Sequence, residues 1–190
     1  MKKLICLLLC LMLTPAFAVA ERAFPNYASE IQWHLSDMLE RYLIWEDMGM
    51  ADGKKEVFGY AADGEYPDFV MRTDSSDRLY ELRVSALVDT VYDSYAAEDM
   101  TAVIESAAVA ADTIALLGHS QNAQSASEYF RNAGVWNLLQ DIQRTRSLSR
   151  YINSPFQQAF SFPGFSCTQE LRYIQNRDCF FYEITLTPGW

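Results

Sequence analysis

The C-terminal part of the chain holds the feature that most restricts the fold: two cysteines joined by a stretch with strand-like character. Residues 167–186 read CTQELRYIQNRDCFFYEITL, and Cys167 and Cys179 are the only cysteines beyond residue 10. After Cys179, apolar side chains occupy alternate positions, which predicts a strand with one buried face. The residues of this face are Phe180, Tyr182, Ile184 and Leu186. A strand here limits what Cys167 can contact.

Residues 167–186 can adopt one of two structures, and each structure excludes the other. If residues 170–174 pair with residues 179–186 in a tight hairpin, Cys167 lies opposite Leu186, seven residues from Cys179. That separation is about 23 Å along a strand, whereas a disulfide needs Cα atoms within about 7 Å. If residues 168–176 form a short helix or folded loop instead, the two thiols can meet. We expect this second structure.

A Cys167–Cys179 disulfide is the expected state because the chain begins with an export signal, and exported proteins with two cysteines are usually oxidised. Two buried, reduced thiols are the main alternative. The spacing is far from the C-x-x-C pattern of redox-active pairs. Two cysteines without a nearby histidine also do not complete a zinc site, so we predict no metal here.

The first twenty residues, MKKLICLLLCLMLTPAFAVA, have the parts of a secretory signal peptide. Lys2 and Lys3 precede a short apolar run, and small residues at Ala18 and Ala20 suit a signal peptidase. The run is too short to span a bilayer stably. We therefore expect cleavage after Ala20, or after Ala18, no stable membrane insertion of the remainder, and one globular domain over residues 21–190. The expected location is the periplasm or the extracellular space.

The net charge of −10 is distributed unevenly. Residues 21–113 contain 20 acidic and 7 basic side chains, whereas residues 114–190 contain 5 and 6. Binding to nucleic acid requires a basic surface, and adsorption to anionic lipid requires basic segments, so neither partner is expected. An acidic surface serves either solubility or the recognition of a basic protein, and the sequence leaves both interpretations open.

Apolar residues recur at helical spacing along much of the chain. The first predicted helix spans residues 26–49, with a stripe of Ile31, Leu35, Met38, Tyr42 and Trp45. The second spans 76–96, with a stripe of Tyr80, Val84, Leu87, Val91 and Tyr95. A third, Ala-rich helix covers 100–117, and a fourth begins with a Ser125–Glu128 capping box and continues to about Tyr151. Gly134 could divide the fourth helix in two.

The remaining segments predict little β structure. Asp63-Gly64 suggests a short hairpin over residues 54–72, whose second arm Pro67 would confine to an edge. Residues 153–166 contain four phenylalanines and two prolines and are expected to form an aromatic loop. The predicted fold is therefore mainly α: an antiparallel bundle of about four helices with a small β-hairpin element and a C-terminal strand.

Motifs for catalysis are weak. The chain has no P-loop, dinucleotide-binding or H-E-x-x-H motif. Glu30, His34 and Asp37 share a helical strip that could hold a metal, although ion pairing along the helix explains it as well. His119 follows a predicted helix and fits no nucleophile elbow. A weak calcium site in residues 63–68 is a further candidate. We expect no cofactor and no metal.

Two groups of residues are candidates for a ligand or partner surface. One is basic, and it could bind phosphate or a carboxylate or simply complement a helix C-terminus; its members are Arg144, Arg146 and Arg150. The other is aromatic, and it could line a pocket or pack on the core; its members are Phe156, Phe160, Phe162 and Phe165.

Together these patterns favour an exported, non-catalytic helical domain that binds another protein, possibly a basic one, as an adaptor, inhibitor or immunity-type factor. A carrier of a small ligand in an aromatic-lined cavity is the alternative. A carboxylate-based hydrolase is the third hypothesis. Sequence does not indicate the oligomeric state.

Overall fold

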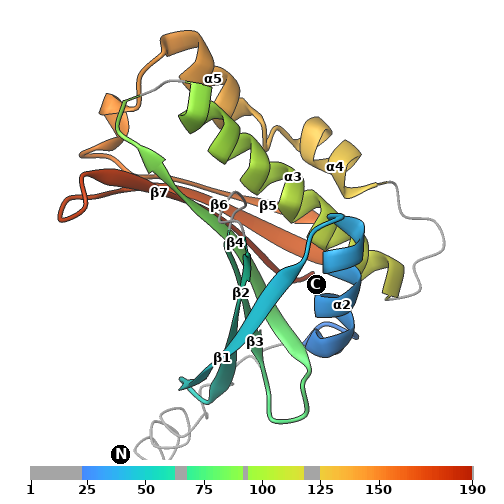
Figure 1. Ribbon diagram of the computed structural model, residues 1–190. Helices are drawn as coiled ribbons and strands as arrows, with labels where there is room; N and C mark the ends of the chain where they lie inside the picture. Colours follow the sequence, from blue (N-terminus) through green and yellow to red (C-terminus); the bar gives the residue numbers. More distant parts are fainter. Residues whose placement is uncertain (1–22, 63–67, 92–93, 118–124, 190) are drawn as a thin grey trace, which may run out of the picture.

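The protein is built on one large antiparallel sheet, so the predicted helical bundle is wrong. The computed structural model describes residues 23–62, 68–91, 94–117 and 125–189. Seven strands form the sheet in the order β1-β2-β3-β4-β7-β6-β5. The described helices lie along one side of this curved sheet, with α3 running across it (Figure 1).

The strands are connected as two meanders separated by helices. The strands of the sheet are β1 (Leu43–Ala51), β2 (Lys54–Ala61), β3 (Asp68–Thr73), β4 (Leu79–Asp89), β5 (Phe156–Phe162), β6 (Phe165–Ile174) and β7 (Cys179–Pro188). The helices are α2 (Ala28–Met38), α3 (Ser94–Leu117), α4 (Ala126–Ala133), α5 (Asn137–Thr145) and the short 3-10 helix η1 (Ser149–Tyr151). Strands β4 and β7 join the two meanders at the centre of the sheet.

The core lies between the sheet and α3. Each central strand points alternate side chains toward the helices, as Val84, paired with Ile184, does on β4 and β7. The buried face of α3 is rich in alanine, which lets the helix backbone approach the sheet closely. Its residues are Ala96, Met100, Val103, Ile104, Ala107, Ala110, Ala111 and Ile114. None of the helices in the described parts of the chain combines the length and apolar character needed to cross a membrane.

Two predicted helices are wrong in part: the first gives way to a strand after its N-terminal half, and the second is replaced by a strand. The first helix ends at Met38, and Glu40 adopts a φ of 53°, which turns the chain into β1. The second predicted helix is replaced by β4, where Leu82, Val84 and Val88 are fully buried. These residues recur at every second or fourth position, the period of a strand. Cross-strand pairing therefore outweighed the helical spacing.

Several other sequence predictions are confirmed. The Ala-rich helix is α3, and Ser125 caps α4 by accepting a hydrogen bond from the backbone N–H of Glu128 at 3.4 Å. Gly134 ends α4 with a φ of 84°, a left-handed conformation that favours glycine. The 54–72 hairpin is present as β2 and β3, although β3 pairs with β4 and is not an edge strand. Its turn and Pro67, the 63–67 candidate calcium-site residues, His119 and the signal peptide lie outside the described residues.

The tight C-terminal hairpin forms, and the predicted disulfide does not. Tyr173 pairs with Phe180 and Cys167 pairs with Leu186, the register that separates the two cysteines. Cys167 lies on the helix side of the sheet, and Cys179, at an odd number of positions from Leu186, lies on the opposite side, across from Asp89. Both thiols are free. The folded-loop prediction failed because the period-2 pattern extends through residues 165–174 as well.

We expect the two thiols to differ strongly in reactivity. Cys167 is fully buried, and burial raises the pKa of its thiol to about 12, whereas Cys179 is only half-buried. Iodoacetamide should therefore label the native chain from Glu21 onward once, at Cys179, and twice after denaturation. A Cys179→Ser variant should remain unlabelled when native. An unlabelled denatured chain lacking two hydrogens by mass would show a disulfide and contradict this structure.

The side of the sheet away from the helices carries a charged network. Arg83 contacts Glu56 at 3.1 Å and Glu81 at 3.0 Å, and Arg72 lies 3.6 Å from Glu56. Glu183 lies beside this network on β7, directly opposite Ser85.

Replacing Glu183 with glutamine should stabilise the protein at neutral pH. Burial, the main cause, and the negative charges of Glu170 and Glu81 raise the pKa of Glu183, while Arg83 opposes the shift. A raised folded-state pKa means that the folded protein binds the proton more tightly, so its stability falls as pH rises from the unfolded-state pKa of about 4.3 through the folded value. The urea midpoint of Glu183→Gln should exceed that of wild type at pH 7, and the difference should close toward pH 4. An equal or larger difference at pH 4 would contradict the assignment.

Candidate functional site

The strongest candidate site is an open cleft between α2 and the edge strand β1, which we call the α2–β1 cleft. Its volume is about 500 Å³. Three aromatic side chains line it together with one carboxylate and a set of small polar groups. The lining residues are Ser29, Gln32, Trp33, Ser36, Asp37, Tyr42, Leu43 and Trp45.

Helix α2 positions one wall of the cleft because it carries two adjacent stripes. The first stripe, Ala28, Ile31 and Leu35, is fully buried against the core and fixes the rotation of the helix. The second stripe begins at Ser29 and continues at helical spacing through Trp33 to Asp37, so it lies beside the first. Trp33 remains 70% exposed although it lines a pocket. A large aromatic residue held open to solvent is available for a ligand.

Strand β1 and the turn before it supply the other wall. Tyr42, which is 79% exposed, lies immediately before the strand. Trp45 pairs with Gly59 on the helix side of the sheet, and its ring lies 6.2 Å from that of Phe69. The buried indole N–H of Trp45 has no hydrogen-bond partner within the described residues. Packing therefore holds this ring in place.

Gly59 is required for the position of Trp45. A Cβ at residue 59 would collide with the ring carbon Cζ3 of Trp45. We expect Gly59→Ala to displace the indole, deform the α2–β1 cleft and cost about 1–3 kcal/mol of stability through overpacking. The change would be measured by urea unfolding and by Trp45 indole chemical shifts. A Gly53→Ala variant is a poor control because Gly53 has a φ of 75°; Ala62→Gly, at an exposed position beyond β2, is a better one. Unchanged indole shifts in Gly59→Ala would contradict this packing.

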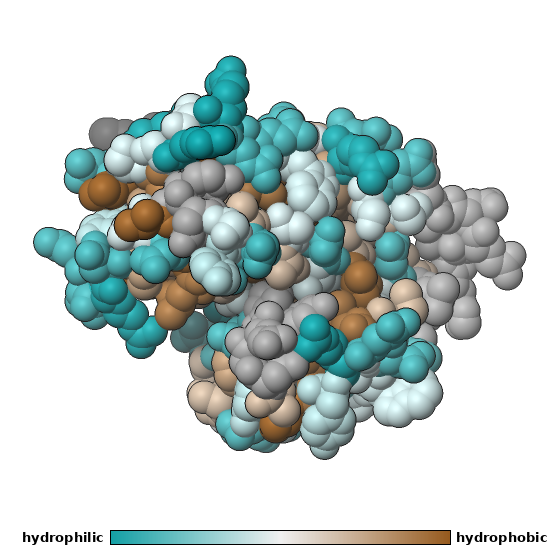
Figure 2. Space-filling view, turned by 45° about the horizontal axis from the view of Figure 1, so that its top comes forward, coloured by the Kyte–Doolittle hydropathy of each residue, from teal (hydrophilic) through white to brown (hydrophobic). Residues whose placement is uncertain are grey.

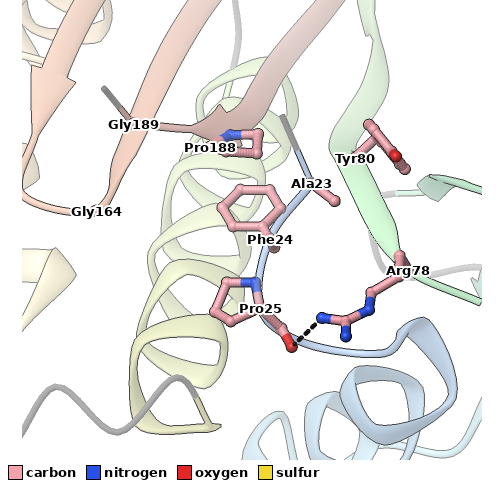
Figure 3. Close-up of a pocket in the computed structure, with 8 residues that line it drawn as sticks. All are labelled: Ala23, Phe24, Pro25, Arg78, Tyr80, Gly164, Pro188 and Gly189. Atoms are coloured by element: carbon pink, nitrogen blue, oxygen red, sulfur yellow. Dashed lines mark hydrogen bonds between the residues drawn. The ribbon is translucent and has the colours of Figure 1, made fainter. Parts of the chain in front are cut away.

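A second pocket, of about 520 Å³, surrounds the start of the described chain (Figure 3). Its polar groups are already engaged in holding the chain. The Arg78 guanidinium donates a hydrogen bond to the carbonyl of Pro25 at 3.1 Å and lies over the ring of Tyr27. The ammonium of Lys54 lies 3.1 Å from the ring centre of Tyr80. Phe24, 1% exposed, packs at the base. These contacts anchor residues 23–27, so we assign this pocket a structural role.

Of the four candidate phenylalanines, Phe162 and Phe165 pack against helix α4, Phe160 stacks on Phe162, and Phe156 contacts Tyr151 of η1. Phe160, Phe162 and Phe165 are buried, and Phe156 is half-buried. The ring of Phe162 lies 4.8 Å from Phe165 and 5.6 Å from Phe130. The predicted aromatic loop is in fact strand β5 and the turn into β6. Neither of the two pockets described above is lined by these rings.

Of the three candidate arginines, Arg144 lies in the last turn of α5, Arg146 follows that helix, and Arg150 lies on η1. Arg144 and Arg150 both form ion pairs with Asp141, the first at 2.7 Å. Arg146 is the C-cap residue, with a φ of 50°. The segment from Arg144 to Arg150 contains no acidic residue, because the acid that pairs with it, Asp141, comes before it in the sequence. Arg144 and Arg146 lie where basic side chains favour the negative end of a helix.

Glu30, His34 and Asp37 make separate contacts in the structure and do not form one site. The backbone N–H of Tyr27 donates to Glu30 at 3.5 Å at the start of α2, and His34 packs edge-on against Trp33 at 4.9 Å. Asp37 alone lines the α2–β1 cleft. Within the residues the structure describes, no group of three histidine, cysteine or acidic side chains is arranged to hold a metal ion.

Sequence reasoning missed Trp33 and Tyr42 as site residues. Tyr42 and Trp45 were placed on a buried helical stripe, and Trp33 was given no role. A signal was present: Trp33 falls between the buried positions Ile31 and Leu35, where a helix would place a polar residue. Figure 2 shows apolar residues in several separate patches among hydrophilic ones in that view, so hydropathy on that face does not mark a single site.

Comparison with known proteins adds no relative from which a function could be transferred. No family model, no curated protein and no solved structure matches the chain. The interpretation of the α2–β1 cleft therefore depends on the chemistry of its own residues.

Proposed function

We propose that the protein is an exported, non-catalytic binding domain that holds a lysine or arginine side chain of a partner polypeptide in the α2–β1 cleft. The observation that carries this proposal is the grouping of Trp33, Tyr42 and Trp45 around one cleft with the Asp37 carboxylate. Aromatic faces attract cations by about 0.5–2 kcal/mol per contact. A carboxylate beside the rings adds a charge-assisted hydrogen bond to an arginine or lysine.

Charge supports a basic partner. Residues 21–113, which include α2 and β1, contain 20 acidic and 7 basic side chains. Exposed acids lie close to the cleft residues in the sequence: Glu30 on α2, Glu40 between α2 and β1, and Glu46 on β1, together with Asp47, which is paired with Lys55 at 2.9 Å. Such a field speeds the approach of a basic segment and weakens as salt rises.

Position in the sheet supports a polypeptide rather than a free cation. Strand β1 is the last strand at its end of the sheet. One side of an edge strand presents backbone N–H and C=O groups that an extended chain can pair with. The partner's basic side chain would enter the cleft while its backbone follows β1 from Leu43 to the bulge between Asp47 and Gly49.

Export is compatible with the position of the first core residue among the described residues. Phe24 is the first buried residue of the described chain, and its backbone N–H donates to the carbonyl of Leu79 at 2.7 Å. Cleavage after Ala18 or Ala20 would therefore leave every described core contact in place. A chain collected from the growth medium or periplasm that starts at Val19 or Glu21 would fit this proposal, and a retained Met1 would contradict it.

The binding proposal is tested with two matched peptides. One is a short extended peptide of alternating threonine and valine with a central arginine; the other has citrulline, which is neutral, in place of the arginine. We expect citrulline to weaken binding by about 5–30-fold, the equivalent of about 1–2 kcal/mol. Trp33→Ala and Asp37→Asn should reduce the preference for arginine.

Tyr95→Ala provides the matched control, because Tyr95 is 71% exposed but belongs to α3, and it does not line the cleft. This variant should bind both peptides as wild type does. Equal affinity for the arginine and citrulline peptides, or a preference that survives Trp33→Ala together with Asp37→Asn, would remove the proposal.

A further inference from the structure

The two edges of the sheet are built differently. At β1, a bulge lies between Asp47 and Gly49, and the acidic residues Glu46 and Asp47 are exposed. The acidic charges would repel an identical β1 edge, although they would still attract a basic segment, and the bulge ends the stretch of β1 that another strand can pair with. Strand β5, at the other end of the sheet, has neither a charged residue nor a bulge within its bounds. Its sequence is FQQAFSF, and its register with β6 is continuous from Phe156 to Phe162.

Strand β5 is also accessible. Gln157, Gln158, Ala159 and Ser161 are exposed, although they alternate between the two sides of the sheet. Gln158 lies on the helix side, opposite Gln169, so the helices leave this part of the edge uncovered. Ile152, which precedes the strand, is 41% exposed.

We propose that β5 pairs antiparallel with β5 of a second copy of this chain, with Ala159 opposite Ala159 of the second copy. This register is self-complementary. It places Phe156 opposite the partner's Phe162, Gln157 opposite the partner's Ser161 and Gln158 opposite the partner's Phe160. Opposed residues share a side of the sheet, so Phe156 meets Phe162 and Gln158 meets Phe160 on the helix side, while Gln157 meets Ser161 on the open side. The sheet then continues from one copy into the other.

Charge favours a second copy as the occupant of this edge. Residues 114–190, which form α4, α5 and strands β5 to β7, contain 5 acidic and 6 basic side chains. Two such surfaces repel each other little, whereas two acidic β1 edges would repel. A charged partner finds no opposite charge on β5 itself. The dimer is independent of the proposed function, because β1 and the cleft lie at the other end of the sheet.

Sedimentation equilibrium of the chain from Glu21 onward tests the dimer. Wild type should approach twice the monomer mass as concentration rises. Ala159→Lys places two ammonium groups opposite each other and should shift the mass to that of the monomer, while the neutral control Ala159→Ser should behave as wild type. Circular dichroism verifies that both variants are folded. A wild-type monomer at every concentration, or a dimer unaffected by Ala159→Lys, would overturn the proposal.

Cysteine cross-linking tests the register even if Ala159→Lys fails to fold. In a Cys179→Ser background, Ala159→Cys should oxidise to a covalent dimer, because directly opposed Cα atoms lie about 4.5–5.5 Å apart, within reach of a disulfide. Gln157→Cys should not link to itself, since four strand positions separate the two copies of residue 157 by about 13 Å. Cross-linking through residue 157 in preference to residue 159 would contradict the register, and cross-linking through neither would contradict the interface.

Discussion

Phe130→Ala is expected to lower the free energy of unfolding by about 3–5 kcal/mol, the range for removing a buried phenylalanine. Phe130 is fully buried on α4, and its ring lies 5.6 Å from Phe162 and 6.4 Å from Phe165. Together with Tyr129, whose ring lies 5.9 Å from that of Phe162, it is how α4 covers β5 and β6. Removing it leaves a cavity under α4 that the paired strands cannot collapse to fill.

The measurement is urea unfolding followed by circular dichroism. Leu87→Ala is the control, because Leu87 is 48% exposed on β4 and points away from the helices. Surface substitutions of this kind usually change stability by less than about 0.5 kcal/mol. A cost below about 1 kcal/mol for Phe130→Ala would mean that α4 does not cover the sheet as described.

Gln169→Leu is expected to cost about 2–4 kcal/mol, because it leaves two buried polar groups without their partner. Gln169 is fully buried in β6. Its side-chain amide donates to the carbonyl of Val135 at 2.9 Å and to the hydroxyl of Tyr182 at 2.5 Å. This amide joins the segment between α4 and α5 to the two strands beneath it.

A double variant separates the hydrogen bonds from packing. Tyr182 is fully buried, and burial raises the pKa of its hydroxyl, so this group stays protonated and needs a partner. Adding Tyr182→Phe to Gln169→Leu removes the orphaned hydroxyl and should restore part of the lost stability, a coupling of about 0.5–3 kcal/mol. Strictly additive costs would show that the two side chains do not interact.

Local signals in the sequence predicted the parts of the fold that depend on local contacts. Helix α3, the Ser125 cap, the Gly134 break and strand β7 all follow from short-range chemistry. The same is true of the β6–β7 register, which the pattern at Tyr173 and Phe180 defined as one of two options. The disulfide was expected because exported proteins with two cysteines are usually oxidised. That argument concerns the chemical environment of the chain, whereas strand geometry decides the register.

The parts that were missed depend on pairing between distant strands. In residues 79–89, apolar side chains satisfy both a helical and a strand period, and only pairing with β3 and β7 decides between them. Residues 153–166 are expected to form a loop because they contain Pro155 and Pro163. Yet Pro163-Gly164 lies between alternating aromatics, and the φ of 88° at Gly164 shows a hairpin turn that requires glycine. The α2–β1 cleft could not be predicted, because it depends on how the turn after α2 places β1 beside that helix.

The central claim is that the α2–β1 cleft binds a cationic side chain of a polypeptide, and the most direct measurement is where the arginine peptide binds. Backbone amide shifts recorded during titration should move first in α2 and in the first half of β1, around Trp33, Tyr42 and Trp45. The citrulline peptide should move the same amides far less at equal concentration. Shifts centred on β5 or on the open side of the sheet, with α2 and β1 unchanged, would contradict the claim.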